Sequence, residues 1–173
     1  DTGVGVVHPC YYEHSLEPAA YDTADSQYMF GSSMLSAPIT RAADDALRGD
    51  VSQTVWLPPG VWVEWGGERA HVGPANYTRS YSHSEMPLFV KGGMAIPMKD
   101  PSNGSPGLAT DLSWVIFPAG GHAGTGVVYD DAGEEFGYQQ QEFSFTRLHY
   151  QTANWTHDAA VEVRLQPLHR CEP

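Results

Sequence analysis

The hydrophobic and polar positions of this chain change pattern along its length, beginning with a short strand-and-helix segment. Residues 4–12 form an apolar run interrupted at His8-Pro9, and a polar, alanine-rich stretch follows from Glu17 to Gln27. The run predicts a buried strand, and Pro18 predicts a helix that begins with proline in its first turn. A strand followed by a helix is a β/α unit. One such unit cannot be a barrel, and we expect it to be the last piece of one.

The next segment, residues 37–99, has the pattern of an antiparallel β domain. Short runs rich in Val, Trp and Tyr alternate with turn residues such as Pro58-Pro59-Gly60 and Gly66-Gly67. Gly/Pro turns at intervals of about ten residues are typical of a β-sandwich. The predicted strands are residues 52–57, 61–65, 77–81 and 88–90.

A linker separates this segment from a second small all-β unit. Residues 99–108, KDPSNGSPGL, are rich in Pro, Gly and Ser and have no hydrophobic period. We therefore expect a domain boundary there, with the second β unit over residues 100–173. Its predicted strands are residues 113–117, 126–129, 142–148 and 160–165.

Charge and composition exclude several classes of partner. The 173 residues include 9 basic and 21 acidic side chains, which give a net charge of −12. Nucleic acids and anionic membranes both require clustered Lys and Arg, so neither is expected as a partner. No apolar stretch approaches the ~18 residues of a membrane span. The chain opens at Asp1 without a signal peptide, so we expect it to begin inside a longer protein or to have been processed.

Cysteines and glycosylation motifs bear on the compartment. Cys10 and Cys171 are too few for a disulfide framework, and their role stays open. Asn76, Asn103 and Asn154 each begin an Asn-x-Ser/Thr acceptor for N-glycosylation. Three such motifs in turn-rich or strand-edge surroundings favour a protein of the secretory pathway: secreted, lysosomal or of the endoplasmic reticulum.

Several polar clusters suggest metals, yet each has a simpler interpretation. Glu17, Asp22 and Asp25 suggest a cation site, but carboxylates also suit the first turns of a helix. The Asp130-Asp131 and Glu134-Glu135 pairs suggest a Ca²⁺ loop, but they lack the alternating spacing of one and fit a hairpin turn better. His8-x-Cys10 and His169-x-Cys171 lack the paired spacings of a zinc site. We therefore expect no metal and no other cofactor.

The tryptophans of residues 55–69, VWLPPGVWVEWGGER, have two interpretations. Trp56, Trp62 and Trp65 could stack on sugar rings at the surface. Strand alternation instead places Trp62 and Trp65 on opposite faces, so at least one of these side chains should lie in the core.

Five motifs, in the order of the family, make the chain resemble the C-terminal third of glycoside hydrolase family 31. Residues 5–15, GVVHPCYYEHS, are similar to the eighth barrel strand of that family, and the strand that enters the first C-terminal sandwich is matched at 33–39, SMLSAPI. Leu57–Trp62 and Pro87–Met98 match motifs of that first, proximal sandwich, and Tyr129–Gly133 matches a turn of the second, distal one. The resemblance covers residues 4 to about 150. One departure is His8-Pro9-Cys10, where the family usually has Arg-Pro-Leu.

The resemblance implies a mainly β fold in three parts. Residues 1–36 would be the last strand and helix of a catalytic β/α barrel, residues 37–99 a proximal antiparallel sandwich, and residues 100–173 a distal one. The implied activity is removal of terminal α-linked glucose from oligosaccharides through a covalent intermediate, with no cofactor. An α-xylosidase or a glycan-trimming glucosidase of the endoplasmic reticulum would share these features.

The catalytic carboxylates of the family are not in this chain. A retaining mechanism needs two of them, about 5–5.5 Å apart, and the family carries them in Trp-x-Asp-Met and Trp-Ser-Gly motifs that are absent here. No catalytic residue is therefore assigned, and the chain alone is expected to be inactive. It would complete and brace the missing barrel, and residues 1–36 should be poorly ordered or expose apolar surface when the chain is made alone.

Glu13 and His14 are the candidate substrate-binding residues, because they follow the strand whose barrel loop would line the active site. The simpler interpretation is a solvated loop carboxylate, or a residue that ties strand to helix. Two functions of other classes stay open. One is a non-catalytic carbohydrate-binding module that depends on Trp62, and the other is an inert structural domain.

Overall fold

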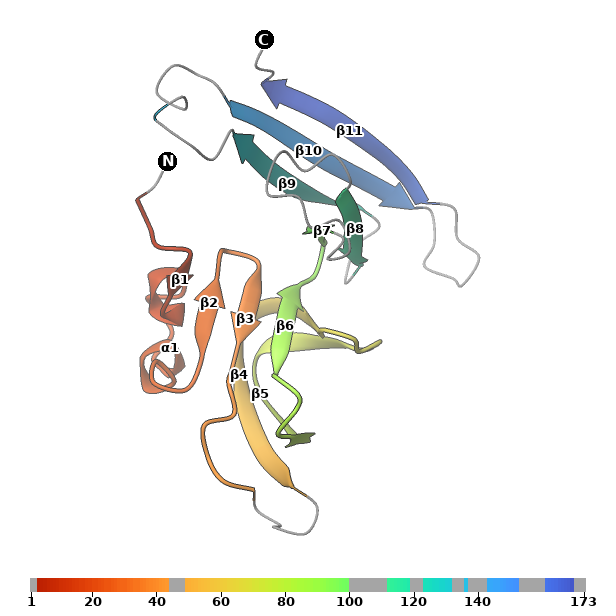
Figure 1. The fold of residues 1–173 in the computed structure, drawn as a ribbon. Coiled ribbons are helices and arrows are strands. Elements are labelled where there is room, and N and C mark those ends of the chain that lie inside the picture. Colours follow the sequence, from red (N-terminus) through yellow and green to blue (C-terminus); the bar gives the residue numbers. More distant parts are fainter. Residues whose placement is uncertain are drawn as a thin grey trace. The chain divides into compact units, whose positions relative to one another are not determined.

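The fold is mainly β and consists of two compact units, residues Asp1–Gly92 and Gly93–Pro173. The computed structural model describes residues 3–43, 49–99, 112–118, 123–131, 136, 143–152 and 161–169. Each unit has its own sheet, with strand order β1-β2-β3-β6-β4-β5 in the first and β11-β10-β9-β7-β8 in the second (Figure 1). The first unit contains β1 (Val7–His8), the 3₁₀ helix η1 (Cys10–Tyr12), α1 (Ala19–Asp22), β2 (Tyr28–Phe30), β3 (Met34–Ser36), β4 (Asp50–Glu64), β5 (Ala70–Ser82) and β6 (Leu88–Lys91).

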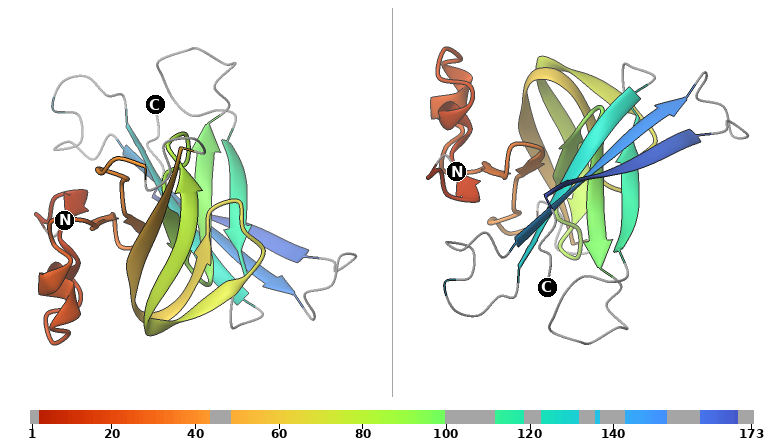
Figure 2. Two further views of the ribbon diagram at one scale, coloured as in Figure 1. Left: turned by 90° about the horizontal axis from the view of Figure 1, so that it is seen from below. Right: turned by 90° about the horizontal axis from the view of Figure 1, so that it is seen from above.

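The predicted first strand is much shorter than expected, because β1 has only two residues. Pro9 is the N-cap of η1, so the chain turns into this 3₁₀ helix directly after β1. The predicted helix is present directly after Pro18, and the Thr23 hydroxyl donates to the Ala19 carbonyl at 2.8 Å where that helix ends. In both views of Figure 2 this segment lies at one side of the sheet formed by β4 and β5.

β4 is one continuous strand of 15 residues, so the prediction of a turn at Pro58-Pro59-Gly60 is wrong. β5 pairs with β4 on both sides of this sequence, with a register shift between Leu57 and Gly60. The prolines, which cannot donate to a ladder, sit in that irregularity, and Gly60 takes a φ of +129° that favours glycine. Opposite them, a Cβ on Gly73 would lie 1.9 Å from the Pro58 carbonyl oxygen, so the two backbones approach too closely for any side chain.

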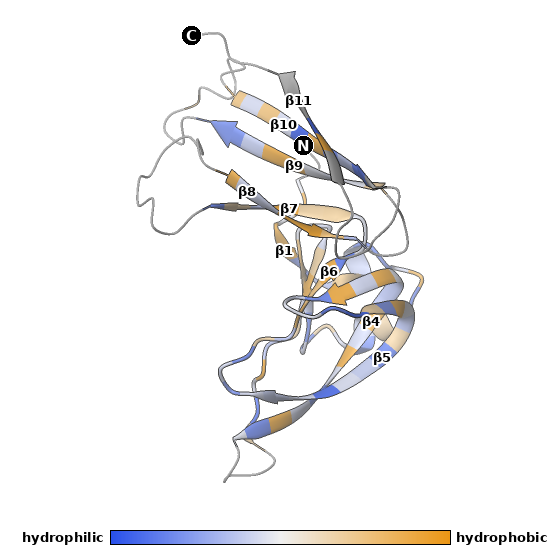
Figure 3. Cartoon of the chain, turned by 90° about the vertical axis from the view of Figure 1, so that its right-hand side faces the viewer, coloured by the Kyte–Doolittle hydropathy of each residue, from blue (hydrophilic) through white to orange (hydrophobic). Residues whose placement is uncertain are grey.

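The core of the first unit gathers side chains from the N-terminal segment and from the long strands. Trp62, Leu57, Phe89, Leu35 and Met29 are all 0% exposed. Orange segments on β4 and β6 in Figure 3 mark this apolar content. Trp56 is 5% exposed. The prediction that at least one tryptophan lies in the core is therefore confirmed, whereas Trp62 cannot present a face to a sugar.

The second unit is a five-stranded sheet whose core lies on one face. It contains β7 (Met94–Lys99), β8 (Leu112–Phe117), β9 (Ala123–Asp131), β10 (Phe143–Thr152) and β11 (Val161–His169). Leu148 and Tyr150 pack with Ala95, and Trp114 and Ile116 cover them. A Cβ on Gly126 would lie 2.2 Å from the Ala95 carbonyl oxygen. This glycine therefore permits the close approach of β9 to β7.

The boundary between the two compact units lies between Gly92 and Gly93, before the predicted linker at 99–108. β7 pairs with β8 in an antiparallel ladder and with β9 in a parallel one, so it belongs to the second unit. Pro97 lies within β7, in register with Trp114, and does not end the strand. At the other end, β2 and β3 join β6 in one sheet. Residues 1–36 and the strands after them thus form one unit by their contacts, and the three-part domain scheme stays a prediction.

Candidate functional site

The N-terminal segment holds the two residues that the sequence singles out for sugar binding. Glu13 lies just after η1, and its Oε1 is 3.3 Å from Nε2 of His8, whose Nδ1 is 2.8 Å from the Gly5 carbonyl oxygen. Both oxygens are acceptors, so both contacts are hydrogen bonds at once only when the imidazole carries two protons. His8 is 7% exposed. The contact fits the simpler interpretation of Glu13 as a residue that ties the segment together, and its sugar-binding role stays a prediction.

The ring of His14 contacts the ring of Trp56. The two rings meet edge to face, with centroids 6.3 Å apart and planes at 87°. Burial lowers the pKa of His14 below its ordinary value of 6.5, against an opposing effect of the Glu13 carboxylate. The neutral ring is therefore favoured in the folded chain. A neutral imidazole can donate or accept a hydrogen bond, but the structure gives His14 no charged role.

Gln27 fixes this segment to β4, and the sequence analysis missed it. The side chain is 3% exposed. Its Nε2 donates to the Trp56 carbonyl at 2.8 Å, and its Oε1 accepts from the Trp56 backbone N–H at 2.9 Å. The same Nε2 lies 3.6 Å from Sγ of Cys10. A buried amide that satisfies both polar groups of one distant residue has no local sequence signal, because its partner lies 29 positions away.

Cys10, the first residue of η1, carries a buried free thiol. It is 0% exposed, and burial raises the pKa of its thiol. Thiol reactivity requires the thiolate, so this position is chemically quiet. Cys171 lies outside the described residues.

A small ionic cluster on β4 and β5 also escaped the sequence analysis. The Arg79 guanidinium lies 3.0 Å from Glu64 Oε1 and 2.9 Å from Glu85 Oε1, and it stacks 4.0 Å above the Tyr81 ring. The Ser82 backbone N–H donates to the second Glu85 oxygen at 2.8 Å. This N–H and the Arg79 charge lower the pKa of Glu85. The cluster joins the end of β5 to the loop before β6, although Arg79 Nε and the Tyr81 hydroxyl are buried in it without a hydrogen-bond partner among the described residues.

The clusters considered for metals are not assembled in the part of the chain that the structure describes. Within those residues no three His, Cys, Asp or Glu side chains are grouped so as to hold a metal. Asp22 lies in α1 and Asp25 beyond it. Asp130 and Asp131 end β9, where the Tyr129 hydroxyl donates to Asp131. Glu134 and Glu135 lie outside the described residues.

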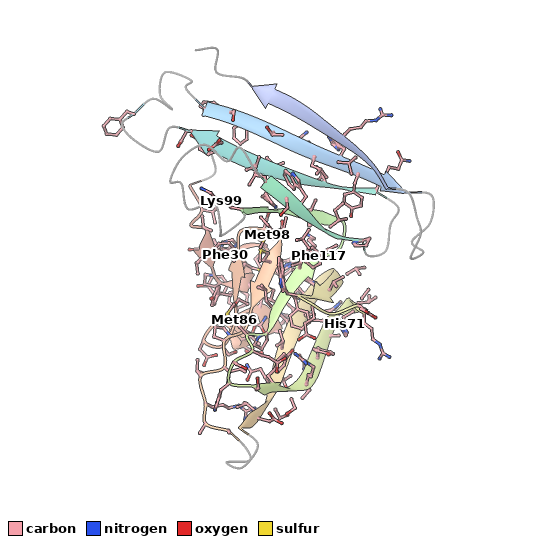
Figure 4. The ribbon with its side chains drawn as sticks, turned by 45° about the vertical axis from the view of Figure 1, so that its right-hand side comes forward. Phe30, His71, Met86, Met98, Lys99 and Phe117 are labelled. Carbon is pink, nitrogen blue, oxygen red and sulfur yellow. The ribbon has the colours of Figure 1, made fainter. Side chains whose placement is uncertain are left out.

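The N-terminal segment of the first unit exposes several large apolar side chains. β1 is the last strand at one edge of its sheet, as far as the described residues extend. Val7 on β1 is paired in register with Phe30 on β2, which Figure 4 labels, and both side chains are about half exposed. We define the N-terminal apolar surface as Val4 (47% exposed), Val6 (62%), Val7 (59%), Tyr12 (60%), Leu16 (93%), Tyr21 (52%) and Phe30 (48%). Exposure of apolar surface by residues 1–36, one of the two predicted outcomes, is thus confirmed.

Comparison with known proteins decides the family. The sequence profile of the "Glycosyl hydrolase family 31 C-terminal domain" matches residues 3–96. The chain belongs to glycoside hydrolase family 31. It is 27% identical over 144 residues to alpha-glucosidase 2 of Bacillus thermoamyloliquefaciens, covering 83% of this chain and 17% of that protein. It is 28% identical over 153 residues to the glucosidase 2 subunit alpha of Saccharomyces cerevisiae, covering 85% of this chain and 15% of that one.

The fold of this family 31 chain is also found in solved structures. A dextranase of family 31 from Flavobacterium johnsoniae superimposes with a TM-score of 0.74 at 22% identity, over 87% of this chain and 18% of that one. The match at this identity concerns the fold alone. The chain spans less than a fifth of each of the three proteins, 15% to 18% of their lengths. No helix among the described residues is long and apolar enough to cross a membrane.

Proposed function

We propose that this chain is the C-terminal part of a retaining family 31 enzyme that removes terminal α-linked glucose from oligosaccharides. The family and the alpha-glucosidases among the relatives support this activity. The two carboxylates of the mechanism would be supplied by a β/α barrel upstream of Asp1. The chain itself would be inactive and would complete and brace that barrel. We also propose that the enzyme passes through the secretory pathway, which the three N-glycosylation motifs support.

The N-terminal apolar surface carries the proposal of bracing. An exposed strand edge with apolar side chains is an aggregation hazard unless another element covers it. Fully burying a large apolar side chain stabilises by roughly 1.5–3 kcal/mol. Even about 1 kcal/mol for each of the seven side chains would add up to about 7 kcal/mol, which is comparable to the whole stability of a domain. The occupant we assign to this surface is the rest of the barrel, which would continue the sheet beyond β1.

The alternative of a carbohydrate-binding module depended on Trp62 as the side chain that contacts the sugar. Trp62 is 0% exposed and its Nε1 donates to the Pro58 carbonyl at 2.8 Å. A side chain in this position cannot stack on a sugar, so a loss of glycan binding on Trp62→Ala would report unfolding. Trp65 is only partly exposed.

The first experiment is to sequence the transcript upstream of the codon for Asp1. We expect an open frame that encodes Trp-x-Asp-Met and, later, a Trp-Ser-Gly-Asp-like segment. The encoded protein should hydrolyse a nitrophenyl α-glucoside, and NMR should show the α-anomer of glucose as the first product. The 173-residue chain alone should show no turnover. A start codon just upstream of Asp1, or turnover by the chain alone, would refute the proposal.

Bracing is tested by two matched variants of the full-length protein. Leu16→Asp places a charge in the N-terminal apolar surface, whereas Val72→Asp places the same charge on β5, where the side chain is 72% exposed. We expect Leu16→Asp to lower the melting temperature of the full-length protein and, as a result, its activity. Val72→Asp should change neither the melting temperature nor the activity. In the isolated 173-residue chain the two variants should behave alike, because both positions are then in water. Equal behaviour in the full-length protein would contradict the bracing role.

A further inference from the structure

Asn76 occupies a special place in the first unit. It is the central residue of β5, the 13-residue strand Ala70–Ser82. Among the described strands, β5 is an edge strand of its sheet and pairs only with β4. Asn76 and Thr78, the first and third residues of the Asn-Tyr-Thr motif, are both exposed. Asn103 and Asn154 lie outside the described residues, so Asn76 is the acceptor whose surroundings can be examined.

A long free edge of this kind needs protection. Within the part of the chain that the structure describes, no strand pairs with the outer edge of these 13 residues, and such an edge offers a template for pairing with the same strand of another molecule. Val72, Pro74 and Ala75 on this strand are exposed as well, so part of the edge is apolar. Pro74 removes one backbone donor two residues before Asn76, and the charge of Arg79, three residues after it, is paired with Glu64 and Glu85. A bulky, solubilising group at the centre would block pairing along most of its length.

We propose that Asn76 carries an N-linked oligosaccharide that covers the free edge of β5. The proposal rests on the secretory location proposed above. The donor is a lipid diphosphate-linked oligosaccharide. A bond forms between Asn76 Nδ2 and C1 of the first sugar, the bond between C1 and the diphosphate oxygen breaks, and Nδ2 releases one proton while the lipid diphosphate leaves with the electron pair. No oxidant or reductant is required.

The contacts of Thr78 provide matched controls. Its hydroxyl shares a hydrogen bond of 2.8 Å with the hydroxyl of Thr54 on β4. Thr78→Val removes this hydrogen bond and also destroys the acceptor motif. Thr54→Val removes the same hydrogen bond and leaves the motif intact. Comparison of the two variants separates loss of the glycan from loss of the cross-strand contact.

The test expresses the natural open reading frame that contains this chain in eukaryotic cells. Peptide mass spectrometry after glycosidase release in ¹⁸O-labelled water would report occupancy at Asn76, because the release converts a glycosylated asparagine to an ¹⁸O-labelled aspartate. We expect Asn76→Gln and Thr78→Val each to lose the mass of one N-glycan, and Thr54→Val to keep it. Size exclusion should show a larger aggregated fraction for Asn76→Gln than for Thr54→Val. An unmodified Asn76 peptide, or equal aggregation of these two variants, would overturn the proposal.

Activity measured on the same preparations separates this inference from the proposed function. An active enzyme with unmodified Asn76 would refute the proposed glycosylation of Asn76 but not the proposed glucosidase activity. A glycosylated protein without α-glucosidase activity would refute the glucosidase proposal and support the modified edge.

Discussion

Replacing Trp62 by alanine would remove the largest side chain of the first unit that is fully buried. Two costs follow from its surroundings. Truncating a buried Trp leaves a cavity and costs about 3–5 kcal/mol. The Pro58 carbonyl also loses the indole N–H that donates to it at 2.8 Å, and an unsatisfied buried acceptor costs about 1–3 kcal/mol. Because these terms overlap, we expect a total loss of about 5 kcal/mol in the free energy of unfolding.

Trp62→Phe keeps most of the apolar volume and loses the hydrogen bond, so its expected cost is about 2 kcal/mol. Urea unfolding followed by tryptophan fluorescence measures both changes. With a slope of about 2 kcal/mol per molar urea, the midpoint should fall by ~2.5 M for alanine and ~1 M for phenylalanine. If alanine abolishes the folded state, the phenylalanine variant still provides the measurement.

Val72→Ala, at a side chain that is 72% exposed, is the control and should change the unfolding free energy by less than about 0.5 kcal/mol. A Trp62→Ala chain with the wild-type midpoint would refute the assignment of Trp62 to the core. The same conclusion would follow from a folded Trp62→Ala chain that specifically loses an affinity for glycans shown by the wild type.

Four further predictions concern the N-terminal segment and the ionic cluster. Gln27→Leu leaves the N–H and C=O of Trp56 unpaired and should cost about 2–4 kcal/mol in urea unfolding, whereas Ser26→Ala, which removes an exposed hydrogen bond, should cost less than about 0.5 kcal/mol. In a Cys171→Ser background, Cys10 should react with a thiol reagent at pH 8 on the order of 100-fold more slowly than the urea-unfolded chain, and equal rates would contradict its burial. The pKa of His14 is lowered in the folded chain, so its contribution to stability is present above pH 6.5 and is lost as the pH falls below it. An NMR titration of His14 should therefore have its midpoint below 6.5, and His14→Gln should lose less stability between about pH 7 and pH 5 than the wild type. The pKa of Glu85 is lowered too, so its stabilising contribution is present above its unfolded value near 4.5 and disappears at lower pH. Glu85→Gln should thus be less stable than the wild type at pH 7 and equal to it near about pH 2, and a constant difference between the two would contradict this linkage.

The strands of the second unit show how far local pattern reaches. Residues 113–117 and 142–148 were predicted as strands, and β8 and β10 contain them almost entirely. The strand prediction failed where a sequence of proline and glycine was interpreted as a turn. Pro58-Pro59-Gly60, which was predicted as a turn, lies inside β4. A proline ends a strand only where the ladder needs its N–H, and this need depends on the neighbouring strand rather than on the sequence nearby.

The candidate site was only partly accessible to sequence reasoning, for a related reason. Glu13 and His14 follow η1 rather than a strand that extends to residue 12, and their role in sugar binding stays a prediction. Their partners were not predicted, since His14 contacts Trp56 and the amide of Gln27 binds the backbone of the same tryptophan from another part of the chain. Arg79 likewise finds Glu64 across the sheet.

The sequence by itself determined the family and the mainly β character of this chain, because motifs and strand periodicity are written in consecutive residues. It also determined that the Trp-x-Asp-Met and Trp-Ser-Gly motifs of the family do not occur in these 173 residues. Only the tertiary structure decided that Trp62 is buried, that β4 runs unbroken past two prolines, and that residues 4–30 expose an apolar surface beside an open strand edge. Burial and strand pairing depend on contacts between segments that are distant in the sequence, and these contacts cannot be inferred from a single sequence.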